Sequence, residues 1–252
     1  MTPQKYWEGL FGCQPEGVSR VYGWYDRLLA RVFPPRCLLC LDAGQPPALD
    51  LCAGCEGDLA RDLPSCTGCA LPLPRPDAFL CSDCLVRPRD FDAAFAAYRY
   101  EHPLDWMVRR MKYGRDIATA RMLGTLLGRR VHSGHVVHVE ALVPVPLHRG
   151  REARRGFNQA MEIARAAGRE LQLPVIYDAG RRRRATPEQV GLDAAERRRN
   201  LHGAFELVQP LRQKRVAIVD DVLTTGSTVE ELARVLKAGG AEWVEVWAVA
   251  RA

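Results

Sequence analysis

Eight of the nine cysteines in this 252-residue chain form four C-x2-C pairs, a spacing that suggests metal chemistry. Four thiolates are a common ligand set for structural zinc, and C-x2-C places two sulfurs on one tight turn. The pairs build two identical C-x2-C-x11-C-x2-C units offset by 29 residues, and this duplication predicts two zinc sites. The predicted ligands are Cys37, Cys40, Cys52 and Cys55 for the first site and Cys66, Cys69, Cys81 and Cys84 for the second.

Metal is favoured over disulfides because the chain shows no sign of export. Its first residues, MTPQKYWEGLFG, lack the regions of a signal peptide, and no apolar run approaches the ~18–20 residues of a membrane span. We therefore expect a cytoplasmic protein, in which thiols stay reduced. A cross-braced pairing of the four C-x2-C pairs remains open at this point. A redox C-x2-C is disfavoured because it normally precedes a helix of a βαβ unit. Cys13 is interpreted as a plain small residue.

A second group of polar residues follows the strongly apolar segment Val216–Val219. Two carboxylates come directly after this segment, and a loop of sequence TTGST then leads into a helical pattern. Ligands of open α/β sheets bind outside the carboxyl ends of strands, and free amides at a helix N-terminus attract phosphate. Because carboxylates accept hydrogen bonds from a diol, the pattern predicts a ligand with both a phosphate and neighbouring hydroxyls. The residues concerned are Asp220 and Asp221, expected to be catalytic, and the substrate-binding Thr224, Thr225, Gly226, Ser227 and Thr228.

Two further polar segments are expected near the same sheet edge. Residues 143–159 follow a strand, and their prolines stiffen a turn whose basic side chains, Arg154 among them, could hold an anion. Residues 184–205 are long and polar, which suits a mobile hood that excludes water. The arginine runs 181–184 and 197–199 are interpreted as solvated helix faces or as contacts to a nucleic-acid backbone. The substrate-binding residues predicted in the first segment are Pro144, Val145, Pro146, His148, Arg149 and Arg155.

The elements that must position these residues alternate between strand and helix from about residue 91. This alternation predicts an α/β fold with a doubly wound, mostly parallel sheet. The Gly239-Gly240 pair is a good C-cap for the last helix. We expect strands at 91–100, 141–145, 175–177, 216–219 and 243–249, and helices around 104–111, 123–127, 157–171 and 229–238.

The rest of the chain is expected to form a small N-terminal module. Residues 37–84 are rich in Cys, Gly and Pro and need a staple such as zinc to fold. We predict a loosely ordered N-terminus over 1–20, a helix (21–33) plus double zinc ribbon over 21–90, and the α/β domain over 91–252. That last part carries 27 Lys and Arg against 19 Asp and Glu, so an anionic partner or substrate belongs there.

The acid pair and the TTGST loop resemble the ribose-5-phosphate loop of type I phosphoribosyltransferases. In that family the adjacent acids bind the ribose hydroxyls of phosphoribosyl pyrophosphate (PRPP) and the loop binds its 5′-phosphate. The order of the C-x2-C repeats, Lys112-Tyr113, PVPLH, RGFNQ, T-P-x-Q, E-R-R-x-N, G-A-F and VDDVLTTGST is similar to that of the ComF family, which includes GntX-like proteins. This resemblance extends from about residue 33 to residue 251.

The resemblance implies a type I phosphoribosyltransferase domain behind a double zinc ribbon, with two structural zinc ions and with PRPP and Mg²⁺ as ligands. It also implies a role in natural competence, with single-stranded DNA and competence proteins such as a DNA-translocating helicase as partners. Three hypotheses remain open: a phosphoribosyltransferase of unidentified acceptor, a non-catalytic accessory factor that binds nucleic acid or protein, and an enzyme of nucleotide salvage. The oligomeric state also stays open, a dimer being one option.

Overall fold

The computed structural model divides the chain into two compact units, Met1–Glu56 and Gly57–Ala252. It describes residues 34–46, 48–60, 64–75, 77–134, 138–183 and 203–252. The predicted N-terminal segment, the helix over 21–33, Cys13 and the larger part of the predicted hood, 184–202, lie outside the described residues. The second four-cysteine group belongs to the larger unit, and the predicted domain boundary at residue 90 stays a prediction.

The described part of the smaller unit is a short ribbon that buries Leu49 and Leu51. Antiparallel bridges join Arg36 to Ala43 and Gln45 to Leu49. Helix α2, Ala53–Gly57, begins at the end of this ribbon and continues into the first residue of the larger unit. The Gln45 amide Nε2 donates to the Leu51 carbonyl at 3.1 Å and to a Glu56 carboxylate oxygen at 2.7 Å.

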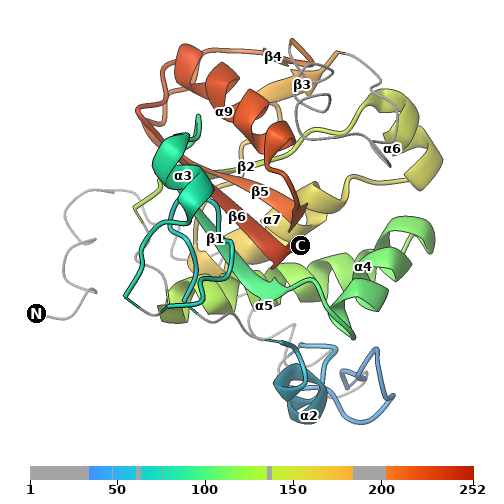
Figure 1. Cartoon of the computed structure of the whole chain (residues 1–252). Helices are drawn as coiled ribbons and strands as arrows, with labels where there is room; N and C mark the ends of the chain where they lie inside the picture. The colour runs from blue at the N-terminus through green and yellow to red at the C-terminus, as the bar shows by residue number, and fades with distance from the viewer. Residues whose placement is uncertain (1–33, 47, 61–63, 76, 135–137, 184–202) are drawn as a thin grey trace, which may run out of the picture. The chain divides into compact units, whose positions relative to one another are not determined.

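The larger unit is built on a four-stranded parallel sheet in the order β1-β6-β5-β2 (Figure 1). Its two central strands are long and almost entirely buried, as parallel strands covered on both faces must be. The strands are β1 (Ala93–Arg99), β2 (Ala141–Pro144), β5 (Arg215–Leu223) and β6 (Trp243–Arg251).

Helices cover both faces of this sheet, which confirms the predicted doubly wound α/β class. On one face α5 (Ile117–Gly134) and α7 (Gln159–Leu171) pack together, and on the other lies α9 (Ser227–Ala238), as Figure 1 shows. Gly124 allows the first two helices to approach closely, because a Cβ there would lie only 2.4 Å from the Ile163 carbonyl oxygen. Helix α9 buries Val229, Leu232, Ala233 and Leu236 against the sheet and ends at Gly239, as predicted.

The second ribbon, residues 64–86, belongs structurally to this α/β unit. Its sulfurs form a small buried cluster with Leu73, and helix α3 (Ser82–Val86) carries the last cysteine. The amide of Ala94 at the start of β1 donates to the Thr67 carbonyl at 2.8 Å. Ala70 is fully buried in the core beneath α9. The ribbon is therefore fixed to one edge of the sheet.

Three local expectations differ from the structure. The segment 175–177 forms only one parallel bridge, from Val175 to Leu142, and is not a strand. Residues 149–155 form the short helix α6 (Arg149–Arg155) where a loop was expected. Strand β5 extends to Leu223, so the acid pair lies within the strand. The remaining elements are α4 (Leu104–Tyr113) and an antiparallel hairpin of β3 (Gly180–Arg182) and β4 (Phe205–Leu207).

None of the helices in the described part of the chain is long and apolar enough to cross a membrane.

Candidate functional site

The sheet opens a crevice between the carboxyl ends of β5 and β2. The two strands are neighbours, yet β5 leads to α9 on one face and β2 leads to α6 and α7, of which α7 packs on the opposite face. The amide of Val145 donates to the Val219 carbonyl at 3.0 Å, which holds the chain after β2 beside the acid pair. Such a reversal of connections is the usual ligand site of open α/β sheets.

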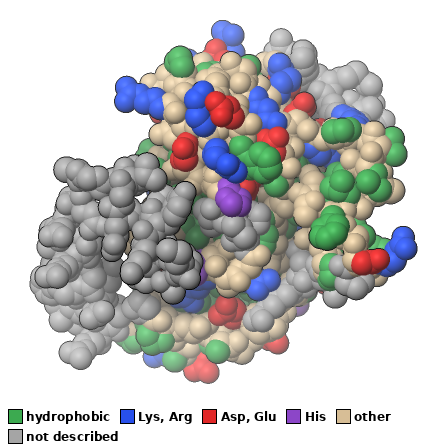
Figure 2. Space-filling model, turned by 90° about the vertical axis from the view of Figure 1, so that its left-hand side faces the viewer, with side chains coloured by type: hydrophobic (Ala, Val, Ile, Leu, Met, Phe, Trp, Pro, Cys, Tyr) green, Lys and Arg blue, Asp and Glu red, His purple; other side chains and the backbone are tan. Residues whose placement is uncertain are grey.

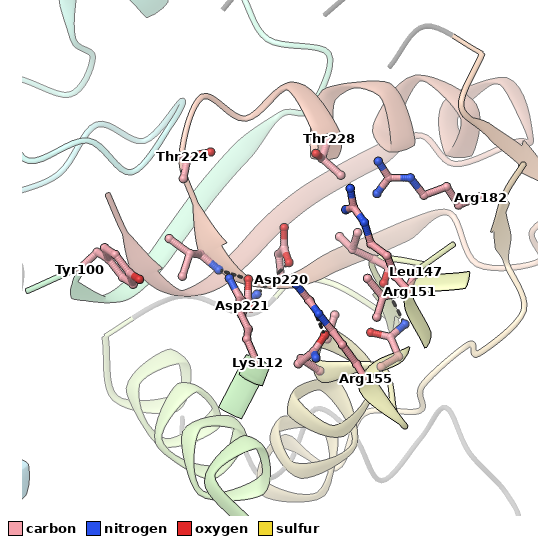
Figure 3. Close-up of a pocket in the computed structure, with 15 residues that line it drawn as sticks. Tyr100, Lys112, Leu147, Arg151, Arg155, Arg182, Asp220, Asp221, Thr224 and Thr228 are labelled. Carbon is pink, nitrogen blue, oxygen red and sulfur yellow. Dashed lines mark hydrogen bonds and ion pairs between the residues drawn. The ribbon is translucent and has the colours of Figure 1, made fainter. Parts of the chain in front are cut away.

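A cavity of about 320 Å³ lies at this crevice (Figure 3). Carboxylates lie at one side of it, where Lys112 pairs with Asp221, and the side chains of Arg151 and Arg182 lie at the other. The lining residues are Tyr100, Lys112, Val145, Leu147, Arg151, Arg155, Asn158, Gln159, Ala160, Arg182, Asp220, Asp221, Val222, Thr224 and Thr228.

The two carboxylates of β5 occupy different environments. Asp221 is bound by the ammonium of Lys112, with Nζ and Oδ2 2.9 Å apart. Burial opposes the charge of Lys112, but Asp221 outweighs it and raises the pKa of this ammonium. Burial and the neighbouring Asp221 carboxylate raise the pKa of Asp220 to about 7. Asp220 is thus poised to exchange a proton or to gain a cation near neutral pH.

The loop after β5 is shaped to receive an anion. Gly226 adopts a left-handed φ of 81° and starts α9 without a side-chain cap, so the first amides of the helix are left for a ligand. The hydroxyls of Thr225 and Ser227 lie 2.9 Å apart and brace the turn. Thr224 and Thr228 border the cavity on the same side as Asp220 in Figure 3.

The opposite wall carries positive charge from two separate elements. Arg151 and Arg155 come from α6, and Arg182 reaches in from the β3–β4 hairpin (Figure 3). Arg182 lies over the ring of Phe205, and burial together with Arg151 lowers its pKa to about 10. Arg155 donates from Nη1 to the Gln159 side-chain oxygen at 3.1 Å, which orients the buried Gln159 amide.

The structure brings together some of the predicted ligand residues and leaves others out. Asp220, Asp221, Thr224, Thr228, Val145 and Arg155 line the cavity, while Thr225, Gly226 and Ser227 form the loop beside it. Pro144, Pro146, His148 and Arg149 are not among the lining residues. The reason is the helical turn of α6: His148 becomes its N-cap, accepting from the Gly150 amide at 3.1 Å, and Arg149 is exposed.

Six polar residues of the cavity carry no predicted role, and Arg151 of α6 is one of them. Lys112 is half-buried near the end of α4, and its only signal in the sequence is its place in the Lys112-Tyr113 motif. Asn158 and Gln159 belong to the RGFNQ motif, but their uncharged side chains do not by themselves indicate a binding role. Arg182 stands in a run of four arginines that looks solvated, and its burial depends on the hairpin. Tyr100 follows β1 and has no motif of its own.

The eight paired cysteines form two separate four-sulfur groups, each drawn from one repeat. Within each group the ligand atoms lie within 4.8 Å of one another, which supports the sequential grouping over a cross-braced one. Sulfurs of Cys40 and Cys52 are 3.6 Å apart, and those of Cys69 and Cys81 are 3.7 Å apart. A tetrahedral zinc ion with ~2.3 Å bonds places its sulfurs about 3.8 Å apart, so both groups fit zinc.

Backbone amides donate hydrogen bonds to several of these sulfurs. The amide of Cys55 donates to the Cys52 sulfur at 3.4 Å, and that of Cys81 donates to the Cys66 sulfur at 3.3 Å. Burial opposes ionisation of Cys37, but amides that include those of Cys40 and Cys52 lower its pKa to about 6. Because the thiolate is the form that binds metal, these amides favour metal binding at Cys37, whereas burial and neighbouring cysteines raise the pKa of Cys55 and Cys69.

The family models that match the chain agree with this two-part construction. A phosphoribosyl transferase domain matches residues 153–252, and a double zinc ribbon domain matches residues 28–85. The chain is thus a protein of the phosphoribosyltransferase fold that carries a double zinc ribbon.

Named relatives extend over nearly the whole chain. Competence protein F of Haemophilus influenzae is 34% identical over 224 residues, covering 86% of this chain and 97% of its own length. DNA utilization protein YhgH of Escherichia coli K12 is 35% identical over 225 residues, with the same coverage of 86% and 97%. Competence protein ComFC of Streptococcus pneumoniae is 24% identical over 207 residues, covering 80% and 87%. The chain belongs to the competence protein F family.

Proposed function

We propose that the cavity between β5 and β2 binds PRPP together with Mg²⁺. The observation that carries this proposal is the charge division of one cavity: a carboxylate pair beside an uncapped helix N-terminus faces a wall of arginines. PRPP has the complementary groups, namely a ribose diol between a 5′-phosphate and a pyrophosphate. The phosphoribosyl transferase family match supports the same ligand.

In this proposal each side of the cavity has a distinct task. Asp220 and Asp221 accept hydrogen bonds from the ribose hydroxyls, and the 224–228 loop donates to the 5′-phosphate. Arg151, Arg155 and Arg182 hold the pyrophosphate on the opposite wall. Asp220, half-buried and with a raised pKa, is the carboxylate that gains most from a nearby cation. Mg²⁺, when bound, offsets the negative charge of the pyrophosphate and of this carboxylate.

Asparagine variants of the two acids test this binding site. We expect Asp220→Asn and Asp221→Asn together to weaken PRPP binding at least about tenfold, since charge-assisted hydrogen bonds contribute roughly 1.5–3 kcal/mol each. Asp178→Asn, which changes an exposed carboxylate outside the cavity, is the matched control. Calorimetry with PRPP and Mg²⁺ measures the affinities, and metal analysis checks that zinc content is unchanged. Equal affinity in all variants, or no binding by the folded wild type, contradicts the proposal.

Whether the bound ribosyl group is transferred is a separate question with two answers. In an enzyme, the cavity would position an acceptor for attack on C1′ as pyrophosphate leaves, and catalysis would consist mainly of orientation and electrostatics. In an accessory factor, PRPP would act as an effector without turnover. A screen for PRPP-dependent pyrophosphate release separates them, with nucleobases, amines and single-stranded DNA as acceptors. Release with a nucleobase alone would favour nucleotide salvage.

A role in competence and in the handling of single-stranded DNA is the second part of the proposal. It is supported by the names of the relatives and by the excess of basic over acidic residues after residue 91. On the face drawn in Figure 2, described lysines and arginines are interspersed with acidic side chains and form no continuous basic patch. We therefore expect weak binding that salt abolishes, measured by fluorescence anisotropy at two salt concentrations. No binding at low salt would leave protein partners as the route to competence.

A further inference from the structure

Two arginines connect the second four-cysteine group to the two ends of the 224–228 loop. Arg251 lies at the end of β6, and Arg89 follows the last cysteine of the ribbon. Each contacts a cysteine of the group on one side and a residue that adjoins the loop on the other. These two connections lie wholly within the larger unit.

The first connection reaches the start of the loop. Arg251 donates from Nε to the Cys69 carbonyl at 3.0 Å and from Nη1 to the Leu223 carbonyl at 2.9 Å. Cys69 closes the first C-x2-C turn of the group, and Leu223 immediately precedes Thr224. One planar guanidinium therefore fixes the spacing between a metal-ligand turn and the entrance of the loop.

The second connection reaches the end of the loop. Arg89 donates from Nη1 to Glu230 Oε1 at 2.8 Å, and both side chains are at least 90% buried. Glu230 lies in the first turn of α9, directly after the loop. Arg89 also pairs with Asp83 and contacts the Cys84 sulfur, so its guanidinium joins the last cysteine of the ribbon to α9.

Zinc would determine how firmly these connections hold. Without metal, the C-x2-C turns lose the bond that joins them, and small zinc ribbons lose their structure. Arg89 would then lose a fixed partner at Cys84, and Arg251 would lose a fixed carbonyl at Cys69.

We propose that zinc in the second site positions the 224–228 loop for its anion, with Arg89 and Arg251 as the positioning residues. The first four-cysteine group belongs to the smaller unit and is not included in the proposed positioning of the loop. The proposal rests on the proposed function for the identity of the anion, PRPP, but not for the effect on the loop itself. It makes ligand affinity depend on the metal state of one of the two sites.

The test compares Arg89→Met and Arg251→Met with a control arginine in α9. Arg234→Met is that control, because Arg234 pairs with Glu231 at 2.6 Å in α9 and has no link to the cysteines. Amide exchange across residues 224–231 reports loop order without any ligand, calorimetry reports PRPP affinity, and native mass spectrometry reports zinc. We expect exchange to rise and PRPP affinity to fall about tenfold in both test variants, with two zinc ions retained and no change in the control.

Two further variants keep the outcome decisive. Arg89→Lys retains the charge but not the planar fork, so we expect partial recovery of both readouts. Cys40→Ser removes a ligand of the first group and should leave the loop unchanged. Wild-type exchange rates in zinc-loaded Arg89→Met and Arg251→Met would overturn the proposal. Loss of loop protection in a protein whose wild type binds no PRPP would instead retain this proposal and refute the proposed function.

Discussion

Asparagine at position 220 should stabilise the ligand-free protein, whereas asparagine at the adjacent position 221 should destabilise it. The ionised form of Asp220 is destabilised in the folded state, because burial and Asp221 raise the pKa of this carboxyl to about 7. Asp221 has the opposite role: its carboxylate is the 2.9 Å partner of the half-buried Lys112 ammonium. Removing it leaves that ammonium without its main counter-charge.

The size of the first effect follows from the pKa difference. A shift of the Asp220 pKa from the ordinary 3.8 to about 7 corresponds to roughly 4 kcal/mol, at about 1.4 kcal/mol per pKa unit. Because Asp220 and Asp221 titrate together, we expect a gain in stability of about 2–4 kcal/mol. An acid with a raised folded pKa costs nothing below its unfolded pKa. The cost grows as pH rises from about 4 to 7 and is constant above, so the gain of Asp220→Asn must follow the same course.

These differences in the free energy of unfolding can be measured by urea unfolding at several pH values from 5 to 9. The proteins compared are the zinc-saturated wild type and both single variants. The expected result is a gain for Asp220→Asn that increases up to about pH 7, and a loss for Asp221→Asn. Far-ultraviolet circular dichroism and zinc content serve as controls for folding. A pH-independent effect at position 220, or effects of the same sign at both positions, would refute this account of the pair.

Two other outcomes follow from the metal groups and the loop. Native mass spectrometry should find two zinc ions per chain. Chelation should unfold the ribbons, since structural zinc supplies ~10–16 kcal/mol of apparent binding energy. A folded metal-free chain would contradict this expectation. Gly226→Ala should lower stability by about 1–2 kcal/mol through its φ of 81° alone, because its Cβ would meet nothing closer than 3.8 Å; an unchanged thermal midpoint would show that the loop adopts another conformation.

Local sequence patterns predicted the sheet well, because its strands are buried on both faces and read as apolar runs. The parallel class, the acid pair on β5 and the glycine end of α9 all follow from such patterns. The prediction of a loop at residues 149–155 was wrong. The basic side chains of this segment are equally compatible with a short helix, and His148 caps α6. Charge in a sequence does not distinguish a loop from a short exposed helix.

The site was predicted mainly on the side that comes from one continuous segment, and only Val145 and Arg155 were predicted correctly from another. Asp220, Asp221 and the loop are adjacent in sequence, so their spacing alone places them together. Lys112 and Arg182 reach the cavity from α4 and from the β3–β4 hairpin, more than 35 residues away in sequence. Only tertiary packing brings these charged side chains close to the two acids. No periodicity of the local sequence indicates that packing.

The two four-cysteine groups differ in how far water can reach them. All four sulfur-bearing residues of the second group are buried, whereas Cys40 of the first is exposed and Cys52 and Cys55 are partly so. An incoming chelator or oxidant must approach a sulfur to displace the metal, so the two ions of one chain should have unequal residence times. Zinc release would then be biphasic, with a fast phase from residues 37–55 and a slow phase that lasts as long as the α/β unit stays folded.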